Sequence, residues 1–177
     1  MLIVPSLCFG GTCALYLAVV RPLGAHPIGV ATRFVMRVLF GAIIAAALVR
    51  GFPDGLATFR YVSGLYLIAA AIIGIRRATT PGQIRTDAQA EATWTRRLGL
   101  GQVLFGFALL THVVEGPDGV LVTMLSGGLA AWMLGSLTLL AIATLEKAQP
   151  DTVLADRRIR QGLGVVLLAV AVYLAWP

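Results

Sequence analysis

The feature that most restricts this chain is a series of six apolar segments almost free of charged residues. They cover residues 2–20, 34–49, 61–75, 98–114, 120–145 and 162–176. A helix needs about 20 mostly apolar residues to cross a bilayer, with a range of about 17–25. The second, third and sixth segments are short and need flanking residues to span. The sequence therefore predicts one all-α integral membrane domain over residues 1–177, a six-helix transmembrane bundle.

The overall composition excludes several classes of protein. Only 12% of the residues are charged and the mean hydropathy is +0.88, whereas soluble domains carry about 25% charged residues. An ordinary soluble enzyme and a disordered chain are both excluded. Although the net charge is +6, we expect no nucleic-acid partner, because the positions of the basic residues have another explanation.

The basic residues predict an orientation in the membrane. Twelve of the 14 lie in or beside the loops that follow the first, third and fifth segments. These are Arg21, Arg33, Arg37, Arg76, Arg77, Arg85, Arg96, Arg97, Lys147, Arg157, Arg158 and Arg160. With the acidic residues included, this side carries a charge of +7 and the other side −1. The positive-inside rule then places both termini on the outer, periplasmic side.

The cellular location follows from the same residues. Thirteen of the 14 basic residues are arginine, a bias associated with GC-rich bacterial genomes. We therefore expect a multi-pass protein of the bacterial inner membrane that contacts anionic lipid head groups. The candidate head-group ligands are Arg33, Arg37, Arg76, Arg77, Arg96 and Arg97. Arg37, placed near the start of the second helix, would snorkel toward the head groups.

Three short stretches recur in the same order along the chain. Val-Leu-Phe-Gly occurs at 38–41 and 103–106, Pro-Asp-Gly at 53–55 and 117–119, and Ser-Gly at 63–64 and 126–127, with offsets of 65, 64 and 63. Pro-Asp-Gly favours a tight turn, since proline presets φ and glycine allows positive φ. The pattern predicts tandem two-helix hairpins related by an axis along the membrane normal. The sixth segment would be a third copy that lacks its turn.

The longest predicted loop, 76–97, precedes the fourth segment. Residues 88–97 fit a short interfacial helix with Trp94 at the level of the head groups. A solvated connector with one aromatic anchor fits equally well.

His112 is the main candidate for a cofactor site. It lies three residues before Glu115, so that both side chains share one helix face. A His–Glu pair can tune a proton site or orient an imidazole ligand, but an interfacial histidine that caps the helix end is the simpler interpretation. His26 is predicted on the opposite side of the membrane, which excludes a bis-histidine heme within this chain. No residues are assigned as catalytic or as metal ligands, because no known catalytic or metal-binding motif is present.

Residues near His112 resemble the NnrU family of bacterial membrane proteins. The similar residues are Ala-Leu-Leu-Thr-His-Val-Val at 108–114, Gly116, Asp118, and Gly-Gly-Leu-Ala-Ala-Trp at 127–132. The family, which is similar to a plant carotenoid isomerase that uses heme, has Arg-His-Pro where this chain has Arg-Arg-Leu at 96–98. It also has a first-helix histidine that is absent here. The resemblance implies that His112 is a heme-linked residue.

Three functional hypotheses follow. The first is a non-catalytic accessory or assembly subunit of a respiratory or photosynthetic inner-membrane complex, with other membrane subunits or itself as partners. The second is a small-solute transporter or channel, although the spans supply few polar residues. The third is an enzyme that handles heme or isoprenoids through His112.

Overall fold

The computed structural model describes residues 3–20, 26–79, 87–114, 119–148 and 153–175, and these are almost entirely helical. The long helices are α1 (Ile3–Val20), α2 (Pro27–Gly51), α3 (Leu56–Thr79), α4 (Asp87–Val113), α5 (Val120–Ala148) and α6 (Val153–Ala175). A short 3-10 helix, η1 (Pro53–Gly55), joins α2 to α3. No strand occurs within these ranges. The prediction of an all-α fold is confirmed for them.

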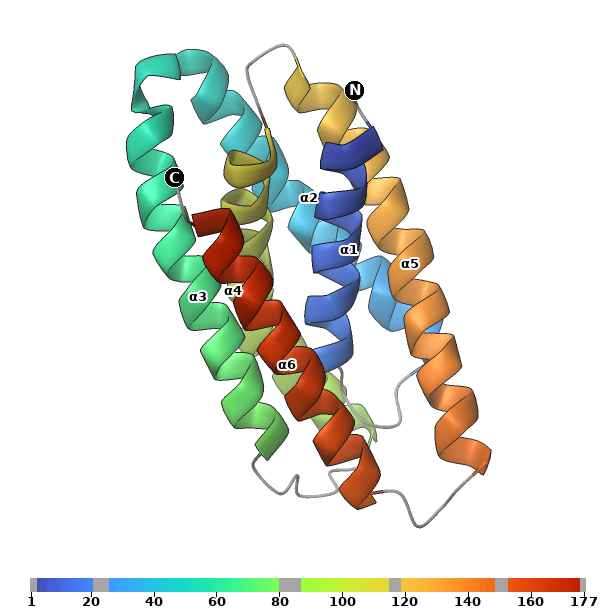
Figure 1. The fold of residues 1–177 in the computed structure, drawn as a ribbon. Helices are drawn as coiled ribbons and strands as arrows, with labels where there is room; N and C mark the ends of the chain where they lie inside the picture. The colour runs from blue at the N-terminus through green and yellow to red at the C-terminus, as the bar shows by residue number, and fades with distance from the viewer. Residues whose placement is uncertain (1–2, 21–25, 80–86, 115–118, 149–152, 176–177) are drawn as a thin grey trace.

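The helices run alternately up and down in one bundle (Figure 1). The start of α1 and the end of α6 lie at the same end of the bundle as η1. The Pro-Asp-Gly stretch at 53–55 therefore makes a short reversal, as its turn residues predict. The second Pro-Asp-Gly stretch begins at Pro117, outside the described residues.

Within the part of the chain that the structure describes, four helical segments are long and apolar enough to cross a membrane. They are Pro27–Gly51, Pro53–Ile73, Val120–Thr144 and Arg158–Ala175. The apolar parts of the other two helices, Ile3–Val19 and Gly99–Val113, are shorter. The chain thus has the character of a helical membrane protein.

Four helices, α2, α3, α4 and α6, begin earlier than the hydropathy pattern predicts. The expected second segment was 34–49, but α2 starts at Pro27, because proline fits the first turn of a helix, where its missing N–H is not needed. His26 precedes it with an extended backbone, and its carbonyl accepts a hydrogen bond from the Val30 N–H. Arg37 therefore does not lie near the start of its helix but ten residues into it. Similarly, α4 is one continuous helix that covers both 88–97 and most of 98–114.

The closest helix pairs join the two halves of the chain. The pairs with the most extensive backbone contact are α1 with α5, α2 with α4, and α3 with α6. Each pair takes one helix from the first three and one from the last three. The helices on either side of η1, α2 and α3, pack mainly on other helices instead of on each other. The predicted hairpin is therefore open, and its arms interlock with the second half of the chain.

Reciprocal glycine contacts bring α2 and α4 together. A Cβ added to Gly41 would lie 1.8 Å from the carbonyl oxygen of Val103, and one added to Gly106 would lie 2.0 Å from that of Val38. Only glycine permits such an approach between two helix backbones. The other two closest pairs use the same device, with Gly10 against Ala130 and Gly64 against Ala175.

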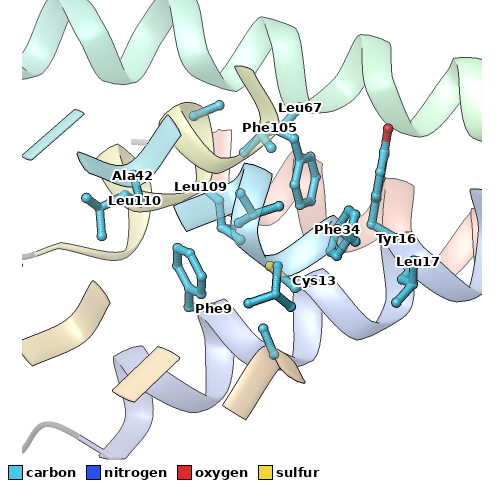
Figure 2. Packing of buried hydrophobic residues seen from close by; sticks show 14 of the residues in the cluster. Phe9, Cys13, Tyr16, Leu17, Phe34, Ala42, Leu67, Phe105, Leu109 and Leu110 are labelled. Carbon is cyan, nitrogen blue, oxygen red and sulfur yellow. The ribbon is translucent and has the colours of Figure 1, made fainter. Parts of the chain in front are cut away.

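An aromatic cluster fills the centre of the bundle where α1, α2 and α4 meet (Figure 2). Tyr16 stacks on Phe105 with a centroid distance of 4.2 Å and on Phe34 at 5.7 Å. Phe9, Leu109 and further apolar side chains pack around these rings. Because stacked rings pack without gaps between them, this part of the core is filled by side chains.

Candidate functional site

His112 lies in the last turn of α4 and points toward α3 and α6. Its Nε2 atom is buried and has no hydrogen-bond partner among the described residues. A Cβ added to Gly64 of α3 would meet this nitrogen at 3.4 Å and the Cβ of Ala175 of α6 at 2.7 Å. The backbones of Arg60 and Leu174 also interact with the imidazole. His112 therefore lies in the seam where three helices meet.

Arg60 closes the end of α4 beside this histidine. Its Nε donates to the carbonyl of Thr111 at 3.0 Å and its Nη2 donates to that of Val114 at 2.5 Å. The last carbonyls of a helix have no partner within the helix, and a cation there also interacts favourably with the helix dipole. Arg60 on α3 therefore caps the end of α4. The simpler interpretation of the sequence had given this role to His112.

The geometry around His112 bears on the heme hypothesis. Nε2 faces the contact between Gly64 and Ala175, so a porphyrin at this nitrogen would require α3 and α6 to separate. In the packing described here the residues do not fit a heme. Glu115, the proposed partner of His112, lies outside the described residues. The cofactor role of the pair stays a prediction.

The predicted head-group arginines occupy different environments. Arg33 and Arg76 are exposed, whereas Arg37 is half-buried between helices. Arg77, Arg96 and Arg97 lie in helices, but their side chains are outside the described part of the structure. Contact with lipid head groups stays a prediction for all six.

A second polar cluster lies closer to the other end of the bundle. The Arg37 Nη1 on α2 donates to the Oε1 of Gln102 on α4 at 3.1 Å. Gln102 is fully buried, with 0% of its surface exposed. On α3, the hydroxyl of Tyr66 donates to the carbonyl of Gly101 at 2.6 Å. Three helices therefore bring polar side chains to one level of the bundle.

Tyr16 adds a fourth helix to this level. Its ring belongs to the aromatic core, while its hydroxyl points toward α3 (Figure 2), and the Tyr16 and Tyr66 phenols lie close enough to interact electrostatically. We call Tyr16, Arg37, Tyr66 and Gln102 the polar layer. It adjoins the stacked rings, to which Tyr16 itself belongs.

Arg37 and Gln102 give the polar layer binding chemistry. Arginine and the amide nitrogen of glutamine donate hydrogen bonds and accept none. A carboxylate, a thiol or an imidazole, any of which could serve as general base or nucleophile, is not among its members. Within the described ranges, no three His, Cys, Asp or Glu side chains come together to hold a metal ion. The layer is suited to a ligand that carries oxygen acceptors.

Several other polar, aromatic and thiol side chains have ordinary surroundings. Trp132 on α5 donates through Nε1 to the hydroxyl of Thr32 on α2 at 3.1 Å. Asp54 is exposed in η1 and His26 is exposed before α2. Cys8 is exposed and Cys13 is buried, and both are free thiols. None of these residues adds to the His112 site or to the polar layer in the contacts described.

Sequence reasoning did not assign Gln102 or Tyr66 to a site. Hydropathy averaged over a span hides a single glutamine among apolar residues, and a neutral amide is not among the charged groups that mark a costly position. The signal that was available is the repeat, because Arg37 and Gln102 are 65 residues apart, the same offset as the two Val-Leu-Phe-Gly stretches.

Compared with known protein families, curated proteins and solved structures, the chain matches none.

Proposed function

We propose that this chain is a non-catalytic accessory or assembly subunit of a bacterial inner-membrane complex, of the respiratory or photosynthetic kind. In this proposal all six helices cross the membrane, both termini face the periplasm, and other membrane subunits or a second copy are the partners. The function of such a subunit is to present a stable helical surface to its neighbours, without chemistry of its own.

The observation that carries the proposal is the filled core. Tyr16, Phe34 and Phe105 stack where a central pathway would have to run. The buried polar side chains among the described residues are hydroxyl groups and the amide of Gln102. Transport needs a hydrated or exchangeable path, and enzymes need reactive groups, so this interior favours a structural role over both alternatives.

The tandem repeat is part of the same proposal. Gly41 and Gly106 hold equivalent places in the repeated stretches and make reciprocal contacts with the opposite helix. Arg37 and Gln102 are also 65 residues apart and bind each other. These contacts support a pseudo-twofold relation between α2 and α4. A fold stabilised from within in this way leaves its outer helix faces available for partners.

The test is a pull-down of the tagged protein from its native membrane in a gentle detergent, read by quantitative mass spectrometry. A stoichiometric set of other membrane subunits is the expected result and would identify the complex. Recovery of the protein alone would contradict the proposal. In that case, a heme absorption band lost in His112→Ala would favour the third hypothesis instead.

The orientation has its own experiment. A cysteine-free variant, Cys8→Ser with Cys13→Ala, receives either Asp54→Cys in the turn or Gly82→Cys in the predicted cytoplasmic loop. A membrane-impermeant maleimide should label the first in intact spheroplasts and the second only after the membrane is permeabilised. The reverse pattern would overturn the proposed orientation.

A further inference from the structure

The hydrogen bond between Arg37 and Gln102 fixes the orientation of a buried amide. A guanidinium group only donates hydrogen bonds, so Gln102 must turn its Oε1 toward Arg37, as the 3.1 Å contact shows. The amide nitrogen is then directed away from Arg37. This Nε2 is buried and has no hydrogen-bond partner among the described residues. Two N–H donors in an apolar interior are costly to leave unpaired.

The charge of Arg37 also calls for a hydrogen-bond acceptor, in this case one that carries negative charge. Arginine stays protonated in proteins, and its guanidinium here is half-buried. The chain contains no Asp or Glu before Asp54, and none in any of the six apolar segments. The partner that Arg37 does have, Gln102, is neutral. In the contacts that the structure describes Arg37 has no carboxylate partner, and an anion from outside the chain would stabilise it.

A glycine of α4 lies beside the guanidinium of Arg37. Gly99 lies one turn before Gln102 on the same face of α4. Among the described residues, a Cβ added to Gly99 would meet the Cζ and Nε atoms of Arg37, both at 4.0 Å. The guanidinium therefore lies beside a position of α4 that carries no side chain. Arg33, four residues earlier on α2, is exposed about 6 Å nearer the end of the bundle.

We propose that Arg37 and the Nε2 of Gln102 together bind an oxyanion, the phosphate of an acidic phospholipid. The phosphate enters beside Gly99 from the leaflet in which α2 and α4 begin, with its acyl chains outside the bundle. Arg37 supplies the charge, and Gln102 supplies a directed donor that a simple surface arginine lacks. This site does not depend on the accessory role proposed above.

The test measures retained lipid by native mass spectrometry of the purified protein in detergent, with phosphatidylglycerol as the probe. Arg37→Gln removes the charge, and Gln102→Glu replaces the Nε2 donor with a carboxylate that pairs with Arg37 internally. The affinity of each variant for phosphatidylglycerol should fall by about tenfold or more, since each loses a hydrogen bond to a charged group. Arg37→Lys keeps the charge and should retain part of the binding. Arg158→Gln, an exposed arginine at the same end of the bundle, is the matched control.

The outcomes separate cleanly. Loss of the lipid in Arg37→Gln and Gln102→Glu, but not in Arg158→Gln, supports the site, provided that the variants melt like the parent protein. Release of the lipid by millimolar inorganic phosphate alone would retain the oxyanion site but assign it to free phosphate. Equal binding by all variants, or equal binding of zwitterionic phosphatidylcholine, would overturn the proposal.

Discussion

Two phenylalanines with the same place in the repeated stretches have opposite environments. Phe105 is 1% exposed and stacks on Tyr16. Its counterpart Phe40 is 58% exposed on the outside of the bundle. The sequence alone does not distinguish them, because both the core and the lipid-facing surface of a membrane bundle are apolar. Which face of each helix is buried was therefore the least predictable part of this fold.

Phe105→Ala should lower the free energy of unfolding by about 2–3 kcal/mol. Replacing a buried phenylalanine by alanine in a soluble protein lowers the free energy of unfolding by about 3–5 kcal/mol. We expect a smaller loss here because the reference environment is lipid instead of water. Phe40→Ala is the matched control and should cost much less, because its ring faces outward. Unfolding by SDS in mixed micelles measures both. Equal losses would contradict the described core.

Arg60 is a residue whose role could be assigned only from its contacts. Arg60→Met keeps most of the aliphatic stem but removes both hydrogen bonds to the end of α4. The amides of the last turn, including the Val114 N–H that bonds to the Leu110 carbonyl at 3.0 Å, should then exchange about tenfold faster. Hydrogen exchange with mass spectrometry measures this. Arg50→Met, in the last turn of α2, should leave those amides unchanged, and an unaltered rate in Arg60→Met would refute the capping role.

At the scale of helices, the sequence predicted their number and approximate place but not their ends or partners. Apolar runs mark only the most apolar parts of each helix, so the first turns of α2, α3, α4 and α6 were missed. Pro27 was a usable start signal for α2. Choice of partner depends on which backbones approach closely, and the small residues that allow this approach are spread over all six helices.

Gly41→Ala and Gly106→Ala should each destabilise the bundle by about 1–3 kcal/mol, the usual cost of overpacking. The added methyl group would meet a backbone carbonyl, which cannot rotate away as a side chain can. Gly51→Ala and Gly162→Ala are the controls. Neither has an atom within 4 Å of the new Cβ, and alanine favours a helix by about 1 kcal/mol over glycine. If all four variants unfold alike in mixed micelles, the close crossing of α2 and α4 is wrong.

For the whole molecule, the pairing of helices makes the two halves dependent on each other. Each of α1, α2 and α3 has its most extensive contact with one of α4, α5 and α6. We expect residues 1–82 or 83–177, expressed alone, to be degraded, because each half leaves its packing faces uncovered. Co-expressed, the two halves should assemble and co-purify through a tag on one of them. A half that accumulates stably without the other would contradict this interlocked arrangement.

The pairing of α1 with α5 also has a consequence during synthesis. The first residue of α5 emerges more than a hundred residues after the start of α1. At about 5–20 residues per second, α1 in the proposed six-span arrangement would wait roughly 6–23 s in the membrane before its main partner exists. Throughout that interval the face containing Gly10, Cys13 and Leu17 is covered only by lipid or by the insertion machinery. Although α1 is synthesised before the other five helices described here, it is thus among the last to reach its final neighbours.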